Sequence, residues 1–292
     1  MAEVSNGRAN LHLHTIFSDG ELPPAEVVRA HADAGFAVIA LTDHDTLAGI
    51  DALGGLDGHG VRLIAGVELS IEDEPRRGLV DAHLLGYGFA LNHRRLRNRL
   101  HQASEAREAQ KRETVRRLAA AGFDVEWSSV RSRARGTVGK PHIVAAIEAA
   151  QPGVKREELY AVMGPGGAAS VARAKDLSLE EAVDLITGAG GVSVLAHPGV
   201  YKHVPDLEVL FRTCAVAGVL GLEVTYPQVP DDPYGPKSAA LMDRFAKTAE
   251  SYGWVATGGD DFHGPTVTPL IRLAAWTATP AGCADELLAR RS

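Results

Sequence analysis

The chain has little of what would make it a disulfide-stabilised or membrane-spanning protein. Its 292 residues include only two cysteines, Cys214 and Cys283, which lie far apart and away from any histidine or aspartate cluster. This disfavours a disulfide framework or a thiolate metal site, and we expect two buried, reduced thiols. No apolar run approaches the roughly 20 residues that cross a bilayer. The first residues also lack the basic and hydrophobic segments of a signal peptide, so we expect a cytoplasmic protein.

Aromatic residues are scarce at 5%, but 45% hydrophobic and 23% charged residues are ordinary for a globular protein. The net charge of −7 argues against a surface coated for nucleic acid. The charge is uneven, because residues 94–140 hold thirteen Lys or Arg and five Asp or Glu, which gives +8 there and −15 elsewhere. This segment is either a solvated helix face with ion pairs or a basic lobe that attracts a polyanionic substrate toward an acidic, metal-binding body.

Short apolar runs alternate with helical patterns along most of the chain. This alternation indicates an α/β fold with parallel strands. A long basic helix over 94–121, followed by loops and short helices over 127–175, interrupts it. The predicted strands begin within 10–19 and continue at 37–41, 61–67, 81–87, 192–195, 221–224 and 254–257. The other predicted helices cover 25–35, 47–53, 179–188, 207–217 and 237–252.

The opening strand contains the sequence His12-Leu13-His14. Alternate side chains of a strand share a face, so the two imidazoles converge on one point. Asp19 follows in a Ser-Asp-Gly turn that could bring a carboxylate over the end of the strand. Neutral imidazole and carboxylate together are ligands for divalent transition metals. A lone His-x-His is weak evidence, since histidines also serve as core or surface residues.

Similar side chains recur just after the later apolar runs, and Asp261 and His263 repeat the spacing of the first histidine pair. In an α/β barrel the C-terminal ends of the strands share one face, where these folds place their chemistry. Nine nitrogen and oxygen ligands exceed what one ion needs, and Glu68 could bridge two ions. The candidate ligands are His12, His14, Asp19, His44, Glu68, His83, His197, Asp261 and His263.

Together these motifs resemble the polymerase and histidinol phosphatase (PHP) superfamily. The resemblance rests on His-Leu-His at 12–14, Thr-Asp-His-Asp-Thr at 42–46, Glu68, Ala-His-Pro at 196–198 and Gly-Asp-Asp-Phe-His-Gly at 259–264. It implies a distorted (β/α)7 barrel of the PHP type with an inserted, mainly helical lobe. It also implies a metal-dependent phosphoesterase that uses a metal-activated water.

Gly-Lys-Pro-His at 139–142 and the run at 190–198 resemble one subgroup of that family, the nucleoside 3′,5′-bisphosphate phosphatases and 5′→3′ exonucleases. This likeness implies that the chain removes phosphate from nucleoside 3′,5′-bisphosphates or cleaves short oligonucleotides. The usual motif of the subgroup has arginine where this chain has Lys140. Lysine keeps the charge but lacks the bidentate fork that matches phosphate.

The resemblance further implies three divalent ions, and the ligand types suit Mn, Fe or Zn. The first would bind His12, His14, Glu68 and Asp261; the second Asp19, His44 and His263; the third Glu68, His83 and His197. Residues 1–99 and 177–292 would form the catalytic barrel, and residues 100–176 a substrate-specificity lobe. The expected substrate contacts are Arg135, Lys140, His142, Tyr201 and Lys202.

Several residues have a plainer alternative. His142 could simply cap a helix, and Arg135 could belong to an exposed loop. Asp43, Asp45 and Asp260 are expected to hydrogen-bond ligand histidines, and Glu223 either supports the site or is structural. The arginines at 107, 112, 116 and 117 are expected to pair with Glu105, Glu108 and Glu113 at helical spacings. His31, His59, His93 and His101 are expected to be exposed.

Two other functions remain open from the sequence. One is a phosphatase for a non-nucleotide metabolite such as histidinol phosphate or a cyclic sugar phosphate. The other is a non-catalytic metal-binding PHP module, although a degenerate module would be expected to have lost some of the nine ligands. The expected partner is a phosphorylated nucleotide or short oligonucleotide, with no membrane and no obligate protein partner evident.

Overall fold

The computed structural model describes residues 7–57, 60–164, 166–171, 177–201, 204, 206–272 and 279–291. Its strands are β1 (Arg8–Leu13), β2 (Phe36–Leu41), β3 (Arg62–Ser70), β4 (His83–Tyr87), β5 (Val192–Leu195), β6 (Gly221–Thr225) and β7 (Val255–Gly258). Its helices are α1 (Pro24–Asp33), α2 (Ala48–Leu53), α3 (Arg94–Ala120), α4 (Trp127–Arg131), α5 (Lys140–Ala150), α6 (Arg156–Met163), α7 (Leu179–Gly188), α8 (Leu207–Ala217), α9 (Pro236–Tyr252) and α10 (Gly282–Ala289).

The seven strands form one sheet in sequence order, from β1 to β7. The pairs β1–β2, β2–β3, β5–β6 and β6–β7 are parallel, but β4 is antiparallel to both of its neighbours. The prediction that the strands are parallel is therefore wrong at β4. A parallel return needs a crossover of a dozen or more residues, usually a helix. The β3–β4 connection, residues 71–82, contains no crossover α-helix, only a 3₁₀ turn at Pro75–Arg77.

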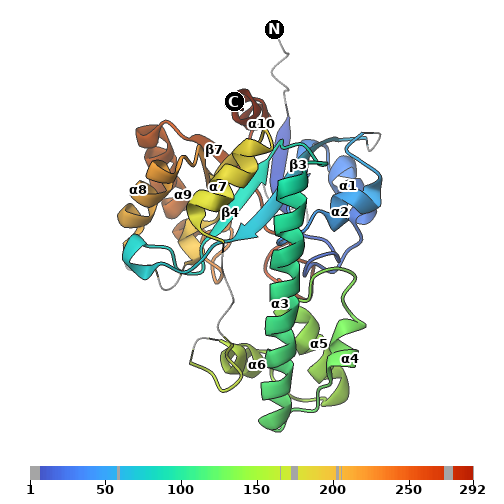
Figure 1. The fold of residues 1–292 in the computed structure, drawn as a ribbon. Helices are drawn as coiled ribbons and strands as arrows, with labels where there is room; N and C mark the ends of the chain where they lie inside the picture. The colour runs from blue at the N-terminus through green and yellow to red at the C-terminus, as the bar shows by residue number, and fades with distance from the viewer. Residues whose placement is uncertain are drawn as a thin grey trace.

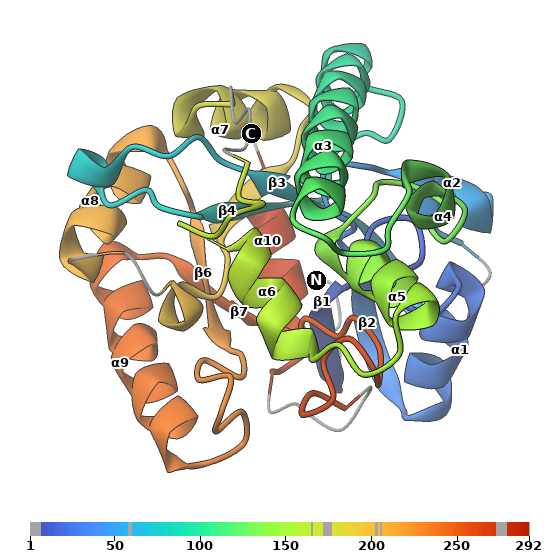
Figure 2. The same ribbon diagram turned by 90° about the horizontal axis from the view of Figure 1, so that it is seen from below.

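The sheet curls until its two edges meet. Beyond the end of β7, the Asp261 N–H donates to the His12 carbonyl at 3.0 Å, and the His14 N–H donates to the Phe262 carbonyl at 3.2 Å. Figure 2 shows the sheet curled, with its helices around it. The predicted α/β fold of a distorted seven-stranded barrel is confirmed.

Side chains on the two faces of the sheet fill two apolar layers. Alternate residues of β2 divide between them, as the period of two requires: Val38 and Ala40 lie in one cluster, Ile39 and Leu41 in the other. The first cluster includes Leu287 of α10, and the second packs against α1, α2, α7, α8 and α9. Both cysteines are buried free thiols, as expected.

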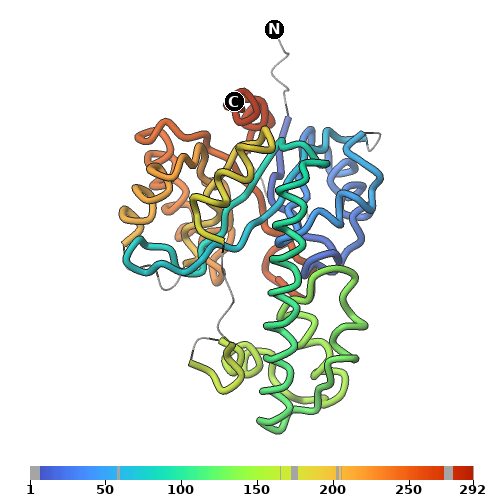
Figure 3. The backbone as a smooth tube through the Cα atoms, viewed as in Figure 1, coloured from blue at the N-terminus to red at the C-terminus, as the bar shows by residue number. Residues whose placement is uncertain are grey.

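Helix α3 carries the chain away from the sheet to α4, α5 and α6 (Figures 1 and 3). Its 27 residues span about 40 Å at 1.5 Å per residue. A separate apolar cluster, drawn only from residues between 115 and 169, holds these helices together. The chain comes back to the barrel beside its point of departure, because Arg99 Nε on α3 lies 3.1 Å from Glu181 Oε1 on α7. Within the described part of the chain, no helix has the length and apolar character to cross a membrane.

Candidate metal centre

The end of β1 brings two histidines and a carboxylate to one point. His12 and His14 are fully buried, and their ring centroids lie 5.2 Å apart. After His14 the chain turns tightly, with the N–H groups of Ser18 and Gly20 both donating to the Thr15 carbonyl at 3.0 Å. This turn returns Asp19 to the strand end, as its Ser-Asp-Gly sequence predicts.

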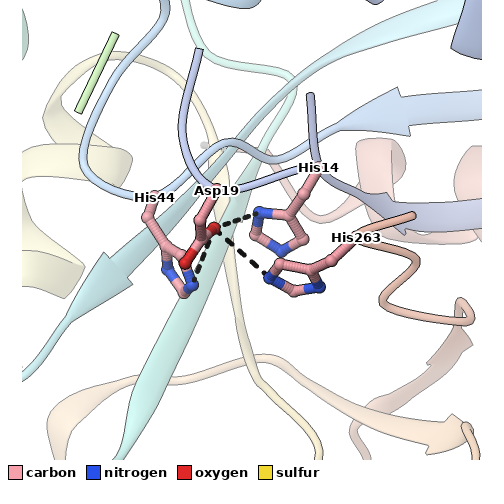
Figure 4. Close-up of side chains that lie close together, drawn as sticks. All are labelled: His14, Asp19, His44 and His263. Carbon is pink, nitrogen blue, oxygen red and sulfur yellow. Dashed lines mark ion pairs between the residues drawn. The ribbon is translucent and has the colours of Figure 1, made fainter. Parts of the chain in front are cut away.

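One group of candidate ligands surrounds Asp19 (Figure 4). Its Oδ1 atom lies 3.3 Å from His263 Nε2, 3.8 Å from His44 Nε2 and 3.9 Å from His14 Nδ1. These four residues come from the β1 end, the turn after it, the β2 end and the segment after β7. The group contains the predicted set Asp19, His44 and His263, and His14 joins it.

A second group contains His12, His14, Glu68 and Asp261. Glu68 Oε2 lies 3.4 Å from His12 Nε2 and 3.2 Å from His14 Nε2. Asp261 Oδ1 lies 3.2 and 3.0 Å from the same two nitrogens. The membership is that of the first predicted ligand set.

Glu68 also lies at the centre of a third group. Its Oε2 is 2.9 Å from His44 Nδ1, whereas its Oε1 is 2.7 Å from His83 Nδ1 and 3.0 Å from His197 Nε2. The predicted third set held Glu68, His83 and His197; His44 comes close as well. The two carboxylate oxygens thus face different histidines, which is the arrangement that a bridging carboxylate requires.

The hydrogen bonding of His12 tests whether cations fit here. Its Nδ1 lies 2.9 Å from Glu223 Oε1 and must donate to that carboxylate, so in the neutral ring, the form that binds a metal, Nε2 carries the lone pair. That lone pair faces oxygens of Glu68 and Asp261, which are also acceptors. A cation between them would satisfy all three atoms. Within the described residues, the buried side-chain atoms without a hydrogen-bond partner include His12 Nε2, His14 Nε2, Asp19 Oδ1, His44 Nδ1, Glu68 Oε2 and Asp261 Oδ1.

The charges of the cluster also favour cations. Burial alone would lower the pKa of His14, but its close contacts with the negatively charged Asp261 and Glu68 carboxylates outweigh burial and raise that pKa to about 10. Burial would raise the pKa of Glu68, yet the surrounding histidines hold it well below its usual value. The imidazoles and carboxylates therefore stabilise each other's charged forms, and bound divalent ions would replace the imidazole protons as the positive charges beside the carboxylates. The residues present fit divalent metal ions.

Strained backbone occurs at the same place. Among the described residues, four that are not glycine have positive φ, and three of them lie at the cluster: Asp45 at 54°, His197 at 21° and Asp261 at 48°. Such conformations are costly and collect at functional sites, where the surrounding structure holds them. Asp45 is held by hydrogen bonds from the Ser70 N–H and hydroxyl, each at 3.0 Å.

The other flanking residues support the cluster in different ways. Asp43 accepts hydrogen bonds from Thr15 and from Ser18 Oγ at 2.7 Å, and Ser18 Oγ in turn lies 3.2 Å from His14 Nδ1. Asp43 thus reaches the histidine through a serine. Asp260 accepts from Asn10 Nδ2 at 2.8 Å. Tyr226, which the sequence did not single out, donates its hydroxyl to Asp261 Oδ2 at 2.9 Å.

Two expectations about charged side chains are wrong. His31 is buried rather than exposed: its Nδ1 donates to the Val27 carbonyl at 2.8 Å and its Nε2 accepts from Asn10. Arg107 does not pair with a glutamate of its own helix but reaches Asp45 at 3.0 Å and Asp19 at 3.7 Å. The other helix arginines behave as predicted, with Arg112 on Glu108 and Arg116 and Arg117 on Glu113. His101 is exposed, His93 is half-buried, and His59 lies outside the described residues.

The predicted substrate contacts have varied surroundings. Arg135 is exposed, Lys140 begins α5, and Lys202 lies outside the described residues. His142 accepts a hydrogen bond from the Gly139 N–H at 2.9 Å and so does cap α5. The Tyr201 hydroxyl accepts from the His83 N–H at 3.0 Å and donates to the Ala196 carbonyl at 2.8 Å, so it is occupied by backbone.

A cavity of about 390 Å³ adjoins the cluster at Asp19. His142, Arg133 and Arg156 line it on the side of the helical segment, together with Glu21 and Thr266. Arg133 belongs to an Arg-x-Arg-x-Arg run that the sequence displays, whereas nothing in the sequence marks Arg156. A larger cleft of about 840 Å³, lined by residues such as Arg112 and Trp127, includes none of the candidate ligands, and the chemistry points to the smaller one.

Six histidines and three carboxylates, gathered at one end of a curled sheet, define a metal-dependent hydrolase. A family model described as the PHP domain matches residues 10–143. The chain is 33% identical over 266 residues to a 3′,5′-nucleoside bisphosphate phosphatase from Chromobacterium violaceum, covering 88% of this chain and 87% of the relative. The chain therefore belongs to the PHP family, and it is a metal-dependent phosphoesterase.

Other relatives carry different substrate names. A phosphoribosyl 1,2-cyclic phosphate 1,2-diphosphodiesterase from Eggerthella lenta is 31% identical, covering 87% of this chain and 94% of the relative. A 5′-3′ exoribonuclease from Haemophilus influenzae is 30% identical, covering 88% and 90%. Among solved structures, a candidate metal-dependent phosphoesterase from Bifidobacterium adolescentis matches with a TM-score of 0.83 at 26% identity, covering 99% of this chain and 98% of that chain.

Proposed function

We propose that the protein hydrolyses phosphate esters of nucleotides, namely nucleoside 3′,5′-bisphosphates and short oligonucleotides taken from the 5′ end. The observation that carries this proposal is the cavity beside Asp19, because it places Arg133, Arg156 and His142 next to the candidate metal centre. A substrate with two phosphates needs one phosphate held at the metal centre and the other held by positively charged side chains farther away. The relatives from C. violaceum and H. influenzae, by their names, act on such substrates.

The nine candidate ligands would hold up to three divalent ions, of Mn, Fe or Zn. Bound ions neutralise the charge that protects a phosphate ester and supply hydroxide near neutral pH by lowering the pKa of water. Glu68 would hold adjacent ions with its two oxygens, since each oxygen faces different histidines. Glu223 would keep His12 in the tautomer that leaves Nε2 free to bind.

We assign residues 1–99 and 177–292 to the catalytic barrel and residues 100–176 to a lobe that selects substrate. Arg133, Lys140 and Arg156 would bind the distal phosphate by charge-assisted hydrogen bonds, with Arg135 at the exposed rim. Tyr201, whose ring lies 5.5 Å from that of His197, and Lys202 are retained as proposed substrate contacts. The apolar cluster between residues 115 and 169 supports this division, because it gives the lobe a core of its own.

A second candidate substrate is a cyclic sugar phosphate, which the name of the E. lenta relative favours. A phosphate-release screen on purified, Mn-loaded protein decides between them. It should cover nucleoside bisphosphates, short RNA and DNA, histidinol phosphate and cyclic sugar phosphates. We expect the highest kcat/KM on a nucleoside 3′,5′-bisphosphate or a short oligonucleotide. A preference for the cyclic sugar phosphate would reject the nucleotide proposal.

Salt dependence separates chain cleavage from action on single nucleotides. Each phosphate contact releases condensed counterions, so log kcat/KM should fall more steeply with log salt when more phosphates are bound. We expect a steeper slope for a five-nucleotide RNA than for a nucleoside bisphosphate. Equal slopes would show that the lobe does not bind several phosphates along an oligonucleotide. Only the proposal of a phosphatase for small molecules would then stand.

A further inference from the structure

Asp19 lies between the barrel and the inserted lobe and is touched from both sides. On the barrel side its carboxylate faces His263, His44 and His14. On the lobe side Arg107 Nη2 lies 3.7 Å from Asp19 Oδ2. A Cβ added to Gly139 would lie 2.5 Å from the Asp19 Cβ and 2.9 Å from Oδ2, so the Gly139 backbone packs directly on this side chain. The proposed ligand is therefore in contact with two parts of the lobe.

Arg107 connects two turns that carry candidate ligands. Its side chain is only 6% exposed, and its Nη1 donates to Asp45 Oδ2 at 3.0 Å while Nη2 faces Asp19. Asp45 follows His44, and its N–H donates to the Glu68 carbonyl at 2.9 Å. One guanidinium on α3 thus ties the turn after β1 to the turn after β2.

A second contact fixes the loop that precedes α5. The Thr137 N–H donates to the Phe17 carbonyl at 2.9 Å. A Cβ at Gly136 would lie 1.9 Å from the same oxygen, so neither Gly136 nor Gly139 leaves room for a side chain. The loop lies against the turn that ends in Asp19, and its position and that of Asp19 are coupled by sterics.

We propose that the lobe completes the metal centre. Arg107 and Gly139 act as positioning residues that fix Asp19, and Arg107 fixes His44 through Asp45. Metal binding by His14, Asp19, His44 and His263 and docking of the lobe on the barrel therefore stabilise each other. By thermodynamic linkage, the free energy by which the docked lobe strengthens metal binding equals the free energy by which bound metal strengthens docking. This inference rests on the proposed metal site.

A purely electrostatic role for Arg107 predicts the opposite sign. A guanidinium beside the centre repels divalent ions, so its removal would tighten metal binding if charge were all that mattered. Lysine at position 107 would keep the charge but could not span two carboxylates with a planar fork. Positioning therefore predicts weaker binding for both Arg107→Lys and Arg107→Met.

The first experiment is a calorimetric titration of metal-free protein with Mn²⁺. We expect Arg107→Lys, Arg107→Met and Gly139→Ala each to weaken at least one ion by about 10- to 100-fold, the range seen when groups supporting a ligand are removed. Asp45→Asn should act in the same direction. The matched controls are Arg112→Lys and Arg112→Met on the exposed side of α3, and Gly188→Ala, where an added Cβ meets nothing within 4 Å. Wild-type or tighter binding by Arg107→Met would overturn the proposal.

The second experiment is hydrogen exchange at the Thr137 amide, with and without Mn²⁺. In the wild-type protein we expect the metal to slow exchange at least tenfold; in Arg107→Met and Gly139→Ala this protection should be lost, while barrel amides keep theirs. Metal binding without any protection of Thr137 would refute the coupling and leave the metal site intact. Failure of the wild-type protein to bind metal would instead refute the proposed function itself. If Arg107→Met does not fold, Arg107→Lys takes its place in this experiment.

Discussion

Glu223 Oε1 lies 2.9 Å from Nδ1 of His12, with both side chains buried. The carboxylate thereby fixes the ring orientation and the tautomer of a proposed metal ligand. We predict that Glu223→Gln lowers metal affinity and kcat/KM by about 10- to 100-fold, because the neutral amide no longer enforces donation from Nδ1. Metal content after gel filtration and phosphate release measure the effect. The exposed Glu250→Gln on α9 is the control, and unchanged metal affinity in Glu223→Gln would contradict the assignment.

Glu68→Gln should abolish hydrolysis. The substitution removes a charge that faces histidines of all three groups, so more than one ion should be lost. We expect less than a hundredth of wild-type activity and reduced metal content, with circular dichroism unchanged. Full activity at normal metal content would rule out a bridging role for Glu68.

The cavity arginines should act on substrate binding. A hydrogen bond to a charged group contributes about 1.5–3 kcal/mol, so Arg133→Ala or Arg156→Ala should raise KM for a nucleoside bisphosphate by about 10- to 100-fold. An aryl phosphate carries no distal phosphate, and its KM should change little. Arg135→Ala, outside the described lining of the cavity, should have a smaller effect, and Arg116→Ala none. Equal losses on both substrates would mean that these arginines maintain the fold or the centre.

His31 should make the fold sensitive to acid. Burial first, and Arg8 in addition, lower its pKa from 6.5 to about 4, although its bond to the Val27 carbonyl opposes this. The unfolded chain therefore takes up the proton first as the pH falls. The stabilisation is complete above about pH 6.5 and is lost toward pH 4, by up to about 3 kcal/mol.

Urea unfolding of metal-free protein from pH 7 to pH 4 tests this sensitivity. The free energy of unfolding of His31→Gln should fall less over this range than that of the wild type. The exposed His101→Gln serves as the control. Parallel curves for His31→Gln and the wild type would show that His31 is not the acid-sensitive group.

The nine candidate ligands could be found in the sequence because each lies in or next to a short apolar strand; His12 is in β1, Glu68 is near the end of β3, and His83 begins β4. A strand end is a local feature, and the fold brings local features of this kind to one face. His12 and His14, or Asp261 and His263, are visible as pairs before any tertiary structure is known. For most of them the contacts required only that the strands lie side by side in order, whereas His83 reaches the same face because β4 is antiparallel to its neighbours.

Arg107, Glu223 and His31 could not be assigned in the same way. Arg107 lies within a strongly charged helix whose pattern resembles that of a solvated one, and only the docking of α3 on two turns buries it. Glu223 and His31 find their partners on β1, far away in sequence. The direction of β4 could not be assigned from the sequence because a strand pattern is the same in either direction; the structure shows that no crossover α-helix lies between β3 and β4.

The ends of the inserted segment lie side by side, where Arg99 meets Glu181. Lengthening a loop whose ends already meet costs little, only about 0.6 kcal/mol for each doubling. The sheet could therefore accept a longer, shorter or foreign insert without any strand changing partner. An engineered or naturally exchanged lobe would need only an arginine at the midpoint of its first helix and a glycine where its backbone packs against Asp19. Substrate preference could then change through one continuous stretch of chain while every metal-binding residue stays in the part that is not exchanged.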